Sequence, residues 1–125
     1  MAKILIIDDE ETVRFSLHEM LAEEGHLIDV AADGEEGLAK VSCDAYDLVI
    51  TDLVMPRKEG IETIEEIKRL FPDLPVLAIS GGSRTRGMDP LVHAKTAGAA
   101  GVLRKPFSCS ELLGLVETLL KREFS

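Results

Sequence analysis

The chain has 125 residues, the usual size of one domain with one core, so we expect a single domain over residues 1–125. Apolar residues make up 46% and charged residues 30%, a balance typical of soluble globular proteins and not of disordered or membrane proteins. The formal net charge of −9 argues against direct binding to nucleic acid or to an anionic membrane, because phosphate groups would repel the chain.

Several features of the sequence favour a cytoplasmic protein. No apolar run approaches the roughly 20 residues that a membrane helix needs, and no signal-peptide cleavage pattern precedes the first apolar run. Cys43 and Cys109 lack CxxC spacing, so we expect free thiols in a reducing compartment. His18, His26 and His93 are scattered along the chain, and we interpret them as structural or surface residues.

Five apolar runs alternate with segments of helical periodicity. We interpret the runs as strands over residues 4–7, 27–31, 48–50, 76–79 and 101–103. The first, third and fourth are continuously apolar, as expected for central strands of a parallel sheet covered on both faces. The second run contains Asp29 and the fifth is short, and both features favour edge strands.

The helical segments follow the strands one by one. Shorter helices are predicted over about 35–41 and 90–96, the second opened by Asp89 as the N-cap before Pro90. Ser108 and Glu111 form a capping-box pattern that opens the last helix. Apolar stripes at helical spacing predict the other three helices: Val13, Leu17, Met20 and Leu21; Ile61, Ile64, Ile67 and Leu70; and Leu112, Leu113, Val116, Leu119 and Leu120.

This order of elements predicts an α/β fold. Strand–helix alternation with short connections favours a doubly wound parallel five-stranded sheet with right-handed crossovers. Edge-like character in the second and fifth strands is compatible with the flavodoxin-like (βα)5 arrangement and its strand order 2-1-3-4-5. The pattern alone does not fix that order.

Polar residues follow four of the five predicted strands, at the end where open α/β sheets bind ligands. Asp8 and Asp9 follow the first strand, Asp52 the third, Ser80 the fourth and Lys105 the fifth. If these strands are neighbours, the side chains meet in one crevice. Carboxylates held a few Å apart repel one another unless a cation lies between them, and oxygen ligands of this kind suit Mg²⁺.

Each feature also has an ordinary structural interpretation. The acidic run 8–11 could favour a helix N-terminus through capping and the helix dipole. Asp52 could end a strand, Ser80 could open a glycine turn, and Lys105 could be a solvated lysine. Their common position at one end of successive strands makes a shared site the stronger interpretation.

These residues, in this order, resemble the receiver domain of two-component response regulators, the family that includes the chemotaxis response regulator. The resemblance covers about residues 3–122, and the ordered set is far more specific than a single Asp-Asp pair. Its matching features are Asp8-Asp9, Asp52, the turn from Met55-Pro56 to Gly60, Ser80, and Lys105-Pro106.

The resemblance implies a phosphoryl-transfer site. Asp52 would accept the phosphoryl group, and Ser80 and Lys105 would contact its oxygens. The donor would be a phosphohistidine on a histidine kinase or a phosphotransfer protein. The domain would assist its own phosphorylation and dephosphorylation without being an enzyme for other substrates. It would signal to a downstream protein target or a fused output domain, and the sequence leaves open whether it acts alone or belongs to a longer regulator or hybrid kinase.

The resemblance also implies a metal site. Asp9, Asp52 and the backbone carbonyl of Val54 would hold Mg²⁺, with Asp8 helping directly or through water. A cis peptide bond before Pro106 would aim the lysine that precedes it.

The chain departs from the family pattern in three places. Val102 stands at the position where, in the family, an aromatic residue usually fills the space beneath the fourth strand and takes part in the conformational switch on phosphorylation. We therefore expect the segment after Ser80, residues 81–98, to carry this switch instead. The stretch between Ser80 and Lys105 is about three residues longer than in the chemotaxis type. Val54 and Gly82 have no polar side chain at positions that influence the attacking water, so we expect no side-chain help there.

The sequence speaks against two other classes of protein and leaves a third open. Haloacid-dehalogenase-type phosphatases require a second acid two residues after the nucleophile, where this chain has Val54. A nucleotide or flavin binder would carry GxxxxGK[ST] or a strand-linked GxGxxG, and neither is present. A receiver-like interaction module that is never phosphorylated stays open.

Overall fold

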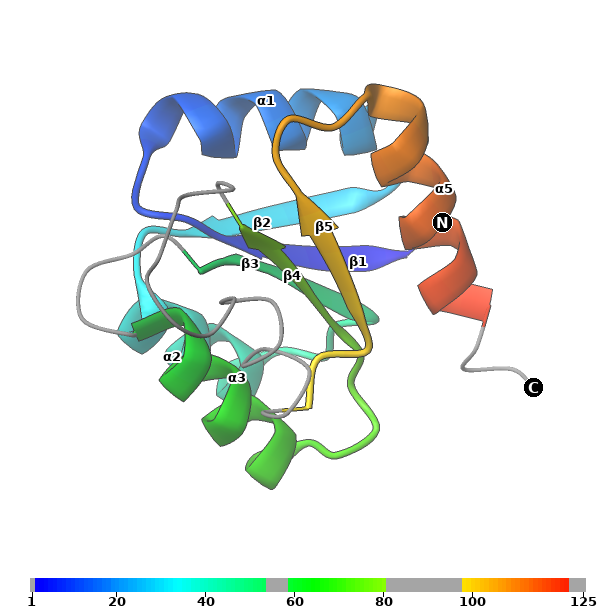
Figure 1. Cartoon of the computed structure of the whole chain (residues 1–125). Helices are drawn as coiled ribbons and strands as arrows, with labels where there is room; N and C mark the ends of the chain where they lie inside the picture. Colours follow the sequence, from blue (N-terminus) through cyan, green and yellow to red (C-terminus); the bar gives the residue numbers. More distant parts are fainter. Residues whose placement is uncertain (1, 54–58, 81–97, 122–125) are drawn as a thin grey trace.

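The structure is a computed structural model that describes residues 2–53, 59–80 and 98–121 (Figure 1). The helix predicted over 90–96 lies outside these residues. In chain order the strands and helices are β1 (Lys3–Ile7), α1 (Glu11–Ala22), β2 (Leu27–Ala31), α2 (Gly34–Cys43), β3 (Leu48–Asp52), α3 (Glu59–Leu70), β4 (Val76–Ser80), β5 (Gly101–Arg104) and α5 (Cys109–Lys121). They alternate as predicted from β1 to β4 and again from β5 to α5.

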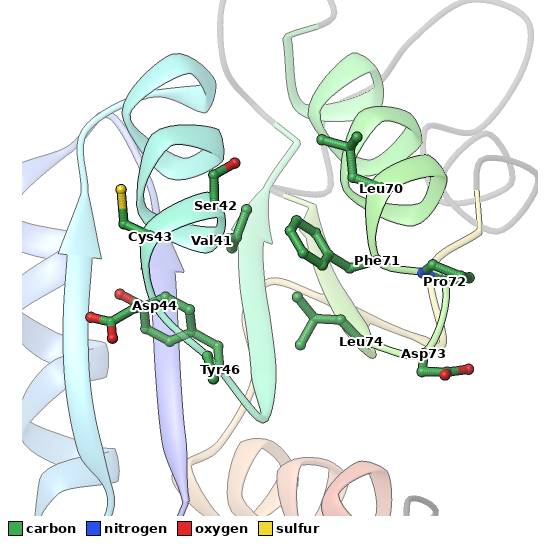
Figure 2. Close-up of a pocket in the computed structure, with 11 residues that line it drawn as sticks. Val41, Ser42, Cys43, Asp44, Tyr46, Leu70, Phe71, Pro72, Asp73 and Leu74 are labelled. Atoms are coloured by element: carbon green, nitrogen blue, oxygen red, sulfur yellow. The ribbon is translucent and has the colours of Figure 1, made fainter.

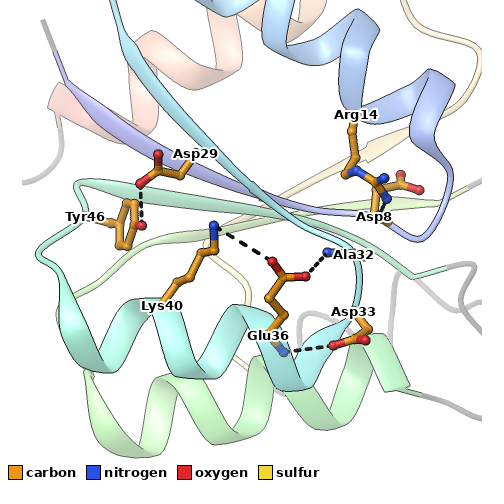
Figure 3. Close-up of polar contacts among 8 residues, drawn as sticks. All are labelled: Asp8, Arg14, Asp29, Ala32, Asp33, Glu36, Lys40 and Tyr46. Carbon is orange, nitrogen blue, oxygen red and sulfur yellow. Dashed lines mark hydrogen bonds and ion pairs between the residues drawn. The ribbon is translucent and has the colours of Figure 1, made fainter.

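The five strands form one parallel sheet in the order β2-β1-β3-β4-β5. This confirms the flavodoxin-like order and places the second and fifth strands at the edges, as Asp29 and the short fifth run indicated. Asp29 is half-buried on edge strand β2, where its Oδ2 accepts a hydrogen bond of 2.7 Å from the Tyr46 hydroxyl (Figure 3).

Helices cover both faces of the sheet (Figure 1). On one face, Leu17 and Leu21 of α1 and Leu112 of α5 pack on even-numbered residues of β1, such as Ile4 and Ile6. The odd-numbered residues of the same strand pack on α2 and α3. Both faces are therefore buried, which is why the central strands are continuously apolar.

The apolar stripe of α3 ends earlier than the sequence indicated. Ile64 and Ile67 are fully buried, but Leu70 is 45% exposed. Leu70 is the last residue of the helix and lines an open groove between the ends of α2 and α3, so it has no sheet beneath it (Figure 2).

Side-chain bonds cap the first turn of two helices, and at α5 they form a capping box. At α5 the predicted pair is confirmed, since the Ser108 N–H donates to Glu111 Oε1 and the Glu111 N–H donates to Ser108 Oγ, at 2.8 and 3.0 Å. At α2, Asp33 Oδ1 accepts from the Glu36 N–H, and Glu36 Oε1 accepts from the Ala32 N–H (Figure 3). Such reciprocal bonds satisfy helix N–H groups that have no partner in the helix.

Neither cysteine forms a disulfide, and both are exposed. Among the helices in the described residues, none has the length and apolar character that crossing a membrane requires.

Candidate functional site

The carboxyl ends of β1, β3, β4 and β5 bring predicted site residues to the same end of the sheet. Asp8 follows β1, Asp52 and Ser80 end β3 and β4, and Lys105 follows β5. The strand pairing continues to this edge, where the Leu53 N–H donates to the Ile79 carbonyl at 2.8 Å. The Lys105 N–H likewise donates to the Ser80 carbonyl at 2.8 Å. These bonds fix the backbone on which the polar side chains stand.

Asp52 and Lys105 form an ion pair at this edge. Lys105 Nζ donates to Asp52 Oδ2 at 3.0 Å, with 3% of the Asp52 side chain and 27% of the lysine side chain exposed. The peptide bond between Lys105 and Pro106 is cis, as predicted. A lysine so placed puts a positive charge beside a buried carboxylate.

The Asp8 side chain contacts the Asp52 side chain at the carboxyl ends of the strands. It is 1% exposed, and burial is the main cause that raises its pKa from 3.8 to about 7. The hydrogen bond and charge of Asp52 raise the pKa further, and the Glu10 N–H bonded to Asp8 Oδ1 at 2.8 Å opposes the shift. Two buried carboxyl groups in contact are unfavourable when both are ionised, and a bound cation removes that cost. The pair therefore fits the oxygen chemistry of a Mg²⁺ site.

Asp9 differs from its neighbour because its side chain is exposed. Within residues 2–53, 59–80 and 98–121, no three His, Cys, Asp or Glu side chains are grouped to hold a metal ion. The remaining predicted ligand, the Val54 carbonyl, lies outside the described residues. The described part of the site thus supplies two carboxyl groups in contact and a third at the rim.

Ser80 is 1% exposed at the end of β4. Val102 is half-buried and packs with the core cluster beneath α2 and α3. The segment expected to carry the switch begins with residues 81–97, which lie outside the described part of the chain, as does Gly82.

Two residues at the site were not assigned a role from the sequence. Arg14 Nη1 donates to the Asp8 carbonyl at 2.7 Å (Figure 3). Gly60 lies in the first turn of α3, where a Cβ atom would come within 2.8 Å of the Asp52 carbonyl oxygen. The only sequence signals were an arginine six positions after Asp8 and the glycine that ends the turn from Met55-Pro56 to Gly60.

A second hollow lies away from this site. A groove of about 670 Å³ runs between the ends of α2 and α3, and Tyr46 and Phe71 are among the residues that line it (Figure 2). None of the predicted site residues lines it.

The strand order and the polar cluster at the carboxyl ends of the strands define a flavodoxin-like α/β signalling domain of the receiver class. The family model described as response regulator receiver domain matches residues 4–117, and the chain belongs to this family of two-component signalling domains.

Curated relatives support the same assignment. Response regulator MprA of Mycolicibacterium vanbaalenii is 36% identical over 124 residues, which cover 96% of this chain and 51% of that protein. MprA of Mycobacterium tuberculosis is 35% identical over 124 residues, with coverage of 96% and 51%. The chain therefore spans about half the length of these relatives.

Solved structures show the same fold over the whole domain. A CheY-like response regulator receiver domain protein from Methanospirillum hungatei superposes with a TM-score of 0.89 at 28% identity, covering 98% of this chain and 96% of that chain. The receiver domain of NtrX from Brucella abortus gives a TM-score of 0.86 at 33% identity, with coverage of 94% and 98%.

Proposed function

We propose that Asp52 accepts a phosphoryl group from a phosphohistidine on a histidine kinase or phosphotransfer protein. The observation that carries this proposal is the buried Asp52 carboxylate, held between Lys105 and Asp8 at the ligand-binding edge of the sheet. In the transfer, a carboxylate oxygen forms the new P–O bond while the P–N bond to the donor imidazole breaks. The electron pair of that bond returns to the imidazole nitrogen, and the product is an acyl phosphate.

Lys105 and Ser80 would stabilise the negative charge of the phosphoryl group during transfer to Asp52. A carboxylate is itself the nucleophile, so no general base is needed. The Lys105 ammonium would move from the carboxylate to a phosphoryl oxygen, and the Ser80 hydroxyl would donate a hydrogen bond to another. Phosphoryl transfer depends mainly on such positioning and charge stabilisation.

Asp8, Asp9, Asp52 and the Val54 carbonyl would hold Mg²⁺, which neutralises charge on the phosphoryl oxygens. The contact between Asp8 and Asp52 supports this set, because burial, with the hydrogen bond and charge of Asp52, raises the pKa of Asp8, and a bound cation would offset the cost of ionising both carboxyl groups. Asp8 would then contribute an inward-facing oxygen and Asp9 an oxygen from the rim.

We further propose that residues 1–125 form one receiver domain that acts as a phosphoacceptor and not as an enzyme on other substrates. Its output would pass to a downstream protein or to a fused output domain. The curated relatives, which are about twice as long, support an output part beyond the receiver. The net charge of −9 favours protein partners over nucleic acid or membrane for this domain, and a cytoplasmic location.

One observation favours a second function, a receiver-like interaction module that is never phosphorylated. Asp9 is exposed, and the described residues bring together two carboxyl groups and not three. Such a module would keep the fold and its contacts with partners but would not form the acyl phosphate.

Incubation with acetyl phosphate and Mg²⁺, followed by intact-mass measurement, separates the two functions. We expect one phosphoryl group on the wild-type chain, none on Asp52→Ala, and one on the control Asp73→Ala, which changes an exposed carboxylate beside the α2–α3 groove. If the wild-type chain gains no phosphoryl group from acetyl phosphate, and none from phosphohistidine donors either, the result would support the interaction module.

A further inference from the structure

The connection between β1 and α1 is held by Asp8 through three separate bonds. The Asp8 N–H donates to the Ala31 carbonyl at 3.1 Å, which continues the pairing of β1 with β2 by one residue. Asp8 Oδ1 accepts from the Glu10 N–H at 2.8 Å. The third bond is to Arg14, whose Nη1 donates to the Asp8 carbonyl at 2.7 Å (Figure 3).

The bond from Arg14 controls the peptide unit between the two acidic residues. The Asp8 carbonyl belongs to the planar peptide group that leads into Asp9, so its direction sets where the Asp9 side chain begins. Glu10, the N-cap residue of α1, makes no side-chain cap bond, so the helix start does not fix this peptide by capping. A short bond from a charged donor is among the stronger hydrogen bonds of proteins. Arg14, anchored on α1, is therefore the support of the Asp8–Asp9 peptide on the helix side.

We propose that Arg14 is a positioning residue for Mg²⁺ binding: it holds the Asp8–Asp9 peptide in the orientation that turns Asp8 inward and keeps Asp9 at the rim. This inference rests on the proposed function, since it concerns the ion that the site would hold. Partners that orient metal ligands in this way commonly change metal affinity by about 10–100-fold when they are removed.

The charge of Arg14 makes the proposal sharply testable. A guanidinium beside a site for a dication repels that ion, so loss of the charge alone would tighten Mg²⁺ binding. Loss of the hydrogen bond would release the peptide and weaken binding. The two effects have opposite signs, and our proposal requires that positioning outweighs repulsion.

Mg²⁺ binding to the full chain is measured by isothermal titration calorimetry for wild type, Arg14→Lys and Arg14→Met. We expect wild type to bind most tightly, Arg14→Lys to be intermediate because it retains the charge and one donor, and Arg14→Met to bind at least about fivefold more weakly. The matched control is Arg69→Met, which removes an exposed arginine paired with Glu66 on α3 and is expected to bind like wild type. In the metal-free proteins, hydrogen exchange of the Glu10 amide should be faster in Arg14→Met than in wild type, because the loop that orders its acceptor is loosened.

The outcomes separate this inference from the proposed function. A wild-type chain that binds no Mg²⁺ would overturn both. A wild-type chain that binds Mg²⁺ while Arg14→Met binds as tightly or more tightly would overturn the positioning role alone. Should Arg14→Met fail to fold, Arg14→Lys decides at equal charge: weaker binding than wild type supports the role, and equal binding overturns it.

Discussion

Replacing Asp8 with asparagine is expected to stabilise the metal-free protein above neutral pH. Asparagine has nearly the same shape and keeps an oxygen that can accept the Glu10 N–H, but it cannot ionise. In the wild type the carboxyl is 1% exposed and contacts Asp52, and its pKa is raised from 3.8 to about 7. The substitution therefore removes a buried charge and leaves the packing in place.

The magnitude follows from that pKa. Each unit of difference between folded and unfolded states is worth about 1.4 kcal/mol, so the shift from 3.8 to about 7 corresponds to about 4 kcal/mol. The sign is that of an acid with a raised pKa: the folded state binds more protons, so stability is lost as pH rises from about 4 through about 7. We expect Asp8→Asn to exceed the wild type in free energy of unfolding by about 4 kcal/mol near pH 8.5. The gap should shrink to about 1 kcal/mol near pH 4.5.

Urea unfolding followed by far-ultraviolet circular dichroism, in the presence of a chelator, measures this gap across the pH range. Asp9→Asn is the matched control, because it neutralises an exposed neighbour, and we expect a change within about 0.5 kcal/mol. Added Mg²⁺ should stabilise the wild type by about 2.7 kcal/mol at 100 times its dissociation constant and narrow the gap. A metal-free Asp8→Asn protein no more stable than wild type at pH 8.5, or a gap that does not grow with pH, would refute the reasoning.

Other predictions concern close backbone approaches and the switch. Gly37→Ala should destabilise the fold by about 1–3 kcal/mol in urea unfolding, because its Cβ would meet Ile7 Cδ1 at 2.4 Å. Gly114→Ala, in open space on α5, should instead stabilise it by about 0.5–1 kcal/mol, and equal effects at the two positions would contradict the packing argument. Gly60→Ala should slow phosphorylation of Asp52 by acetyl phosphate, since the new Cβ would press on the Asp52 carbonyl at 2.8 Å; an unchanged rate counts against that contact. Residues 81–98 should change amide exchange protection when a phosphate mimic is added, and unchanged protection would end the idea that this segment carries the switch.

The alternation of strands and helices was predictable because the driving pattern is strong. The runs that became β1, β3 and β4 are fully apolar, with core residues exposed by 0–1%, as burial on both faces demands. Strand order was not fixed by that pattern, since hydrophobicity reports burial and not which strand lies beside which. What indicated the order was the polar Asp29 in one run and the shortness of another, which mark the two edges.

The sequence also did not predict which side chain of the Asp8-Asp9 pair is buried. In a strand buried on both faces, alternation no longer tells which side chain points inward, so nothing in the sequence said that Asp8 would be buried and Asp9 exposed. The structure shows the reason: the Asp8 N–H still pairs with the Ala31 carbonyl, so the chain leaves the sheet only after Asp8. Arg14 was not predicted as a site residue for a related reason. Its partner is a backbone carbonyl, and a sequence pattern does not reveal which backbone carbonyl a side chain will bond.

The residues at the strand ends are more informative together than one at a time, since Asp52 contacts both Asp8 and Lys105. Capping explains Asp33 and Ser108, whose side chains accept helix N–H groups, but the N-cap of α1 has no such bond. The acidic residues before α1 are therefore not accounted for by helix capping. One of them, Asp8, is buried against Asp52, where ionisation is costly without a nearby cation. Burial at that cost, together with the Lys105 ion pair, is what distinguishes a binding site from an acidic surface.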